Sequence, residues 1–349
     1  MRARLLLAGA LVAVLVVGGL VVWRVTDRGT EFARAVSLAP AGSVRLGWTD
    51  WAAVRTEVGL ADGAQTSPAA LDRLLTEAYD RDLSSASALG TSAETLQDSL
   101  GISPATLDWE LYAQSPDGAA LVLKVPDSLS FADLADGLER LGFARPDDSD
   151  GTWRGGPDVL AGVDGELTPE LQYWTLLEDE GVVVTSDAAA YVATAAEAVT
   201  GDGERVDGLD DVVDPLGAPV SGLVYTGGYA CEHLAMAQAD ATDQATADQL
   251  VVAAGTVSPL TGLALAARPG GRVLVTMSFE SDDQARANAD SRSVLATGPA
   301  IGQGGRFGDR FTLDSATADE SVVTLRLTPV EGAYVLSDLS SGPVLFATC

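Results

Sequence analysis

Three chemically versatile residue types are scarce in this chain of 349 residues: it has one histidine (His233), one lysine (Lys124) and two cysteines. A Ser-His-Asp triad through the single histidine would lack the Gly-x-Ser-x-Gly elbow that often accompanies it. One histidine and two cysteines also do not make a standard zinc site. The sequence therefore predicts no catalytic residues, no metal site and no cofactor, and we expect a protein that is not an enzyme.

Positive charge is scarce as well. The chain has 21 basic and 50 acidic residues, a net charge of −29. Residues 1–28 hold four arginines and one aspartate, a balance of +3, so the rest of the chain carries −32. Such a body repels nucleic-acid phosphates and anionic lipid head groups. We expect no nucleic-acid partner and a charge that serves solubility; a basic partner is the specific alternative.

One long apolar run is present. Residues 5–23 carry no charge, and as a helix they would span about 28 Å, close to the hydrocarbon core of a bilayer. Arginines flank the run, and Trp23 lies where interfacial aromatic residues are found. A cleavable signal peptide would have a shorter apolar region followed directly by a small-residue site. The run therefore predicts a transmembrane helix (5–23) after a cytoplasmic tail (1–4), and a single-pass protein of the cell membrane.

The two cysteines bear on topology. The arginines on either side of the run are nearly balanced and do not decide its orientation. An even number of cysteines after a membrane-targeting start favours a disulfide, Cys231–Cys349, and an oxidising compartment. Closing a loop of about 118 residues would contribute roughly 4–5 kcal/mol in the chain-entropy model. We expect an extracytoplasmic body that follows a juxtamembrane connector, 24–38.

The body reads as two similar lobes. In the first lobe, 39–200, the sequence predicts a strand at 44–48, helices, a hairpin, a helix after Ser130, a second hairpin and an alanine-rich helix. An acidic linker, 201–217, precedes the second lobe, 218–349. There the order returns, with strands at 222–226, 263–267, 272–279, 322–327 and 333–336 and a helix after Ser281. The sequence predicts an α+β fold: a transmembrane helix, then two tandem, duplicated lobes with mostly antiparallel sheets and helices on one face.

One compact cluster qualifies as a ligand-binding site. Trp48, Asp50, Trp51 and Arg55 fall where the first strand becomes a helix. Indole faces beside a carboxylate and a guanidinium suit a sugar or another flat polar ligand, although tryptophans at such places are also common core anchors. We retain these four residues as candidate ligand-binding residues.

The acidic turn Asp147-Asp148-Ser149-Asp150-Gly151 resembles part of a calcium loop. The EF-hand register would place Pro146 at the first ligand position and Pro157 at the twelfth, where an acid is required. We therefore expect an acidic turn that leads into a strand.

Two segments carry a resemblance, Gly47-Trp48-Thr49-Asp50-Trp51-Ala52-Ala53-Val54-Arg55 and Gly342-Pro343-Val344-Leu345-Phe346-Ala347-Thr348-Cys349. The chain resembles an uncharacterised family of membrane-anchored extracytoplasmic proteins of high-GC Gram-positive bacteria. The resemblance implies a location and an architecture, and no activity.

We therefore expect a non-catalytic binding or scaffolding component of the bacterial cell envelope, whose partner is another envelope or membrane protein. A ligand carrier or sensor that uses the cleft between the lobes is the alternative. A carboxylate-based hydrolase is a further one, because 50 acidic residues leave room for two facing carboxylates.

Overall fold

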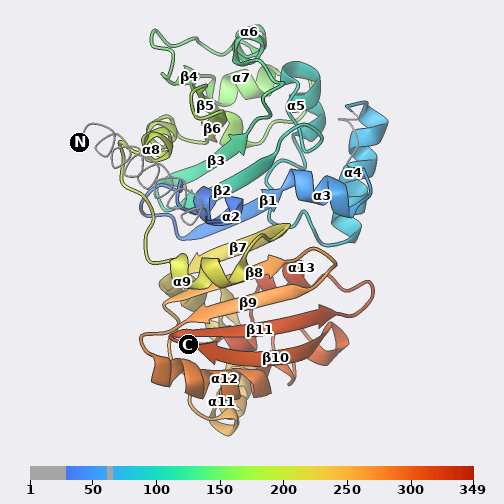
Figure 1. Cartoon of the computed structure of the whole chain (residues 1–349), viewed down its shortest axis with the longest axis vertical. Coiled ribbons are helices and arrows are strands. Elements are labelled where there is room, and N and C mark those ends of the chain that lie inside the picture. The colour runs from blue at the N-terminus through green and yellow to red at the C-terminus, as the bar shows by residue number, and fades with distance from the viewer. Residues whose placement is uncertain (1–28, 61–65) are drawn as a thin grey trace, which may run out of the picture.

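The computed structural model describes residues 29–60 and 66–349. They form an α+β fold around one eleven-stranded sheet, in which every strand pair is antiparallel (Figure 1). The predicted α+β class and antiparallel pairing are confirmed. The predicted transmembrane run, 5–23, lies outside the described residues, and within them no helix is long and apolar enough to cross a membrane.

The strands of the first half are Arg45–Asp50 (β1), Trp109–Ser115 (β2), Gly118–Lys124 (β3), Trp153–Arg154 (β4), Tyr173–Leu177 (β5) and Val182–Ser186 (β6). Those of the second half are Ser221–Thr226 (β7), Gly262–Ala267 (β8), Val273–Ser278 (β9), Phe311–Asp319 (β10) and Val322–Pro329 (β11). Their order across the sheet is β10-β11-β9-β8-β7-β1-β2-β3-β6-β5-β4.

The second half repeats the strand order of the first. Reading outward from the middle of the sheet, β1-β2-β3-β6-β5 corresponds to β7-β8-β9-β11-β10. The halves meet where β1 pairs with β7, with Trp48 opposite Gly222, and Figure 1 shows one half above this seam and the other below. The halves therefore share one continuous sheet instead of forming two separate ones.

The helices are Glu31–Val36 (α2), Trp51–Glu57 (α3), Pro68–Asp80 (α4), Ala93–Leu100 (α5), Phe131–Leu141 (α6), Gly156–Gly162 (α7), Ala189–Thr200 (α8), Asp210–Val213 (α9), Gly227–Tyr229 (α10), Ala241–Ala254 (α11), Asp282–Ala296 (α12) and Val335–Ser340 (α13). Side chains of α2, α8 and α9 join the core on one face of the sheet, and those of α3 to α6 and α11 to α13 join the core on the other.

Helices on both faces correct the expectation of helices on one face. Alternate residues of β3 enter different cores, Leu121 and Leu123 on one side of the sheet and Val122 on the other. In β8 and β9 every residue is buried. Strands covered on both faces are apolar almost throughout, whereas strands with one face in water alternate between apolar and polar residues. The nearly unbroken apolar sequences of β8 and β9 are therefore the signal of the second helical layer.

Side-chain caps mark the starts of several of these helices, including the two expected after Ser130 and Ser281. The side chains of Thr30, Asp50, Ser67, Ser130 and Ser281 each accept a hydrogen bond from a backbone N–H in the first turn of α2, α3, α4, α6 and α12. Ser92 occupies the N-cap of α5, and its side chain makes no capping bond.

Two segments predicted as spacers are packed into the body. The predicted linker, 201–217, contributes Leu209, Val212 and Leu216 to the core beneath α9. The predicted connector, 24–38, contains α2, whose Phe32 ring lies 5.7 Å from the indole of Trp48. Apolar side chains at intervals among the aspartates give the supposed linker a buried face.

The final strand pair was placed one element too late. Residues 333–336 are not a strand, since α13 begins at Val335; the hairpin is β10–β11, which turns at Glu320. The disulfide Cys231–Cys349 is confirmed, with Cα atoms 5.7 Å apart. The terminal segment before Cys349 is buried, from Val344 to Ala347.

Candidate functional site

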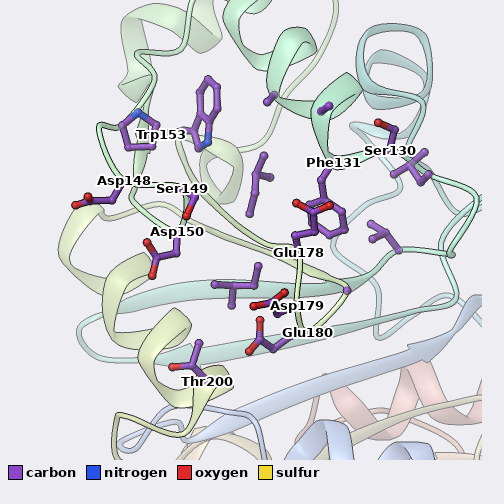
Figure 2. A pocket seen from close by; sticks show the side chains of 18 of the residues that line it. Ser130, Phe131, Asp148, Ser149, Asp150, Trp153, Glu178, Asp179, Glu180 and Thr200 are labelled. Carbon is purple, nitrogen blue, oxygen red and sulfur yellow. The ribbon is translucent and has the colours of Figure 1, made fainter.

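A groove of about 910 Å³ lies at the outer end of the first half, away from the seam between the halves. Its walls come from the chain that follows β3, the first turn of α6, the loop that leads into β4 and the turn between β5 and β6 (Figure 2). The pairing of β4 with β5, with Trp153 opposite Trp174, brings the loop before β4 to the β5–β6 turn.

Part of the groove lining is apolar. Ser130 caps α6, so Phe131 begins the helix at the groove, where its ring is half-buried. Trp153, Leu176 and Leu177 also line the groove, each less than a tenth exposed. These side chains belong to the packed core and hold the groove in shape.

The rim of the groove is acidic. Seven carboxylates form this acidic rim: Asp127, Asp147, Asp148, Asp150, Glu178, Asp179 and Glu180. In Figure 2, Asp148 and Asp150 lie on one side of the opening, and Glu178 and Asp179 on the other. Within residues 29–60 and 66–349, no rim carboxylate forms an ion pair or accepts a side-chain hydrogen bond.

Among the residues that the structure describes, one cation, Arg145, lines the groove, and it already has partners within the protein. Its guanidinium lies 3.3 Å from Glu139, and its Cζ lies 5.2 Å from the centre of the Trp153 ring. Lys124, beside the β5–β6 turn, donates to the backbone oxygen of Glu180. Its ammonium group therefore does not pair with the side-chain carboxylate of Glu180. The groove therefore carries a formal excess of negative charge over an apolar wall, an arrangement that attracts cations.

The carboxylates are spread around the groove. Among the residues that the structure describes, no three acidic, histidine or cysteine side chains converge closely enough to hold a metal ion. The rim therefore provides an extended negative field instead of a chelating cluster. Charges distributed in this way suit a ligand that carries several separate positive groups.

The structure separates the two tryptophans of the cluster predicted from sequence. Trp48 and Trp51 are both 1% exposed or less, and they lie in cores on opposite faces of the sheet. The Trp48 indole donates to the carbonyl of Pro219 at 3.2 Å, and the Trp51 indole donates to Glu110 at 2.7 Å. Each indole has a partner within the protein and packs as a core anchor.

The two charged members of that cluster lie near each other. Asp50 caps α3 by accepting from the N–H of Ala53 at 2.8 Å, and Arg55 donates to the carbonyls of Pro104 and Leu107 at 2.8 Å. Burial raises the pKa of Asp50 and lowers that of Arg55. Both side chains hold the start of α3 and the loop before β2 in place.

Glu110 is a buried carboxyl group that the sequence reading missed. It is fully buried on β2 and accepts from the Trp51 indole, the hydroxyl of Ser87 and the N–H of Ala88, at 2.7–2.9 Å. Burial raises its pKa to about 7. A carboxyl group of that pKa suits general-acid chemistry, but three protein donors occupy this one and no solvent reaches it.

His233 and Cys231 do not combine into a nucleophile and base. Cys231 is in the disulfide, and the exposed imidazole of His233 lies 4.3 Å, ring to ring, from Tyr229 and 3.9 Å from the carboxylate of Glu232. The groove, with its acidic rim over an apolar lining, is therefore the candidate binding site. The structure confirms the expected acidic turn 147–151 and the strand after it, β4. The sequence did not predict that β4 pairs with β5, which brings this turn to the acidic β5–β6 turn.

No protein-family model matches the chain, and no curated protein matches it. One solved structure, crystal form I of TP0453, is similar over 89% of this chain and 98% of that chain, with a TM-score of 0.41 and 7% sequence identity.

Proposed function

We propose that this chain is a single-pass, membrane-anchored extracytoplasmic protein of the bacterial cell envelope that binds or scaffolds another envelope or membrane protein without catalysing a reaction. The acidic groove carries this proposal, because it combines an apolar wall with a rim of carboxylates that have no partner within the described residues. A rim of unpaired charge around an apolar surface is typical of an interaction site.

The location rests on two features. The uncharged run 5–23 is long enough for a transmembrane helix, and the Cys231–Cys349 disulfide suits an oxidising compartment. We further propose that the two halves of the body arose by duplication. The repeated strand order on either side of the β1–β7 seam supports this idea, since five strands recur in the same arrangement.

Protease treatment of spheroplasts tests the location. We expect external protease to degrade the body while a cytoplasmic marker stays intact, because the body follows the membrane anchor on the outer side. Protection of the body until the membrane is lysed would contradict the proposed topology.

Co-purification from solubilised membranes tests the binding role. A rim variant, Asp150→Asn with Glu178→Gln, removes one charge from each side of the groove. A control variant, Asp290→Asn with Glu331→Gln, removes two exposed charges from the second half. We expect the partner to be lost from the rim variant and retained by the control; equal recovery with both variants would overturn the assignment of the groove.

A further inference from the structure

We propose that the groove binds an extended polypeptide segment that carries several lysine or arginine residues together with an apolar side chain. This inference rests on the proposed binding function and names the chemistry of its partner. The inference rests on two features that occur together in the groove, the acidic rim and the apolar lining. The rim would bind the positive charges of the ligand, and the apolar lining would bind its apolar side chain.

The acidic rim indicates that the ligand carries positive charge. Its seven carboxylates come from three separate stretches of chain, and Arg145, which also lines the groove, is already paired with Glu139. Carboxylates of like charge held around one opening repel one another, and a ligand with several cationic groups relieves that repulsion. Because the carboxylates lie on both sides of the opening, the cationic groups must be spaced along the ligand (Figure 2).

The apolar lining of the groove indicates that the ligand also has an apolar side chain. The half-buried ring of Phe131 is accessible beside Leu129 and Pro126, which are also only partly buried. A ligand made of charge alone would leave this surface exposed to water. A side chain such as leucine would cover it, at a gain of about 25 cal/mol for each Å² of apolar area buried.

A polypeptide fits these features better than a lipid surface or a small polyamine. Anionic lipid head groups are repelled by the acidic rim. A polyamine supplies spaced charges but no branched apolar group for Phe131. A volume of about 910 Å³ lies at the upper end of the range for small-molecule sites, and it accommodates several side chains of an extended segment.

Titration calorimetry on the full-length chain in a non-ionic detergent tests this inference. The first probe is a short peptide of lysine, serine and leucine, and the second replaces each leucine with serine. Spermine is the third probe. The proteins are the native chain, the rim variant, the control variant and Phe131→Ala, each checked for folding by circular dichroism.

We expect the leucine-containing peptide to bind the native chain most tightly. The rim variant should bind it about tenfold more weakly, because two exposed ion pairs are lost, and the control variant should bind it as the native chain does. Phe131→Ala should weaken the leucine-containing peptide and leave the serine peptide unchanged, since only the former uses the apolar wall.

Three results would overturn the inference: no binding of the leucine-containing peptide, equal affinity for both peptides with no effect of Phe131→Ala, or spermine binding at least as tightly as the peptide. The proposed function fails separately. If the rim variant still loses its cellular partner while the peptide does not bind, the groove binds a partner of another chemistry; if neither effect is seen, both proposals fail.

Discussion

The carboxylate of Asp82 accepts hydrogen bonds from the backbone N–H groups of Leu336, at 2.5 Å, and Ser337, at 3.2 Å. Asp82 follows α4 in the first half, and the two N–H groups lie in the first turn of α13 in the second half. The residue at the N-cap of α13, Tyr334, makes no side-chain capping bond. Asp82 therefore supplies the cap from more than 250 residues away and fastens one half to the other.

Replacement of Asp82 tests this cap. Asp82→Ala leaves two N–H groups without an acceptor and should lower the free energy of unfolding by about 1–3 kcal/mol. Asp82→Asn keeps one acceptor oxygen and should retain most of the stability. Chemical denaturation of both variants at neutral pH measures the difference; equal loss in the two would show that the hydrogen bonds are not what matters.

The same group predicts a dependence on pH. Burial raises the pKa of Asp82 from 3.8 to about 6. A folded-state pKa above the unfolded value stabilises the fold fully below pH 3.8, and that stabilisation is lost as the pH rises through about 6. Denaturation at a series of pH values should show a shallower slope near pH 6 in Asp82→Asn than in the native chain, and identical slopes would contradict the assignment.

The contribution of Glu110 to stability should change in a higher pH range than that of Asp82. Its pKa is raised from 4.5 to about 7, so protonation stabilises the fold fully below pH 4.5, and this contribution of about 3 kcal/mol is lost as the pH rises through 7. Glu110→Gln should remove this slope at the cost of about 1–3 kcal/mol at low pH, because the amide supplies one acceptor atom where the carboxyl has two. If that variant titrates like the native chain, another group is responsible.

The disulfide should contribute strongly to stability. Cys231 and Cys349 close a loop with a sequence separation of 118, for which the chain-entropy model gives roughly 4–5 kcal/mol. Cys349→Ser should lower the melting temperature accordingly, and natively purified protein should react with maleimide only after reduction. Reaction of both thiols before reduction would show that the native bond does not form.

Arg292 provides a test of the buried hydrogen bonds in the second half of the chain. This guanidinium is completely buried on α12 and donates to the carbonyls of Ser258 and Phe346 at 2.7 and 2.6 Å. Arg292→Met leaves both carbonyls unpaired and should cost about 3 kcal/mol of unfolding free energy. Arg286→Met, on the exposed side of the same helix, is the matched control and should change stability by less than about 0.5 kcal/mol. If both variants change the free energy of unfolding equally, the buried hydrogen bonds of Arg292 contribute nothing.

Local signals explain which parts of the fold the sequence predicts. Ser130 followed by Leu134 and Leu138 contains both the cap and the buried face of α6, so the helix is readable in isolation. The start of α13 cannot be recognised from its own sequence, because its capping group is Asp82 in the other half. For that reason residues 333–336 were predicted to be a strand.

The edge strand β10 was missed for another reason. It alternates between buried, half-buried and exposed residues, and its register shifts at a bulge between Leu313 and Ser315. A bulge breaks the period of two that marks a strand. The groove was missed because its two acidic turns meet only through the pairing of β4 with β5, a contact that no local pattern encodes.

Photo-crosslinking in living cells tests the central claim, that the groove receives a partner, most directly. A photoreactive amino acid at Ser149, between the carboxylates of Asp148 and Asp150, would sample the groove, and one at Asp290 would sample the far half. The account predicts a discrete crosslinked product at Ser149, to an envelope or membrane protein with a basic segment, and none at Asp290. The same products at both positions, or none at Ser149, would contradict it.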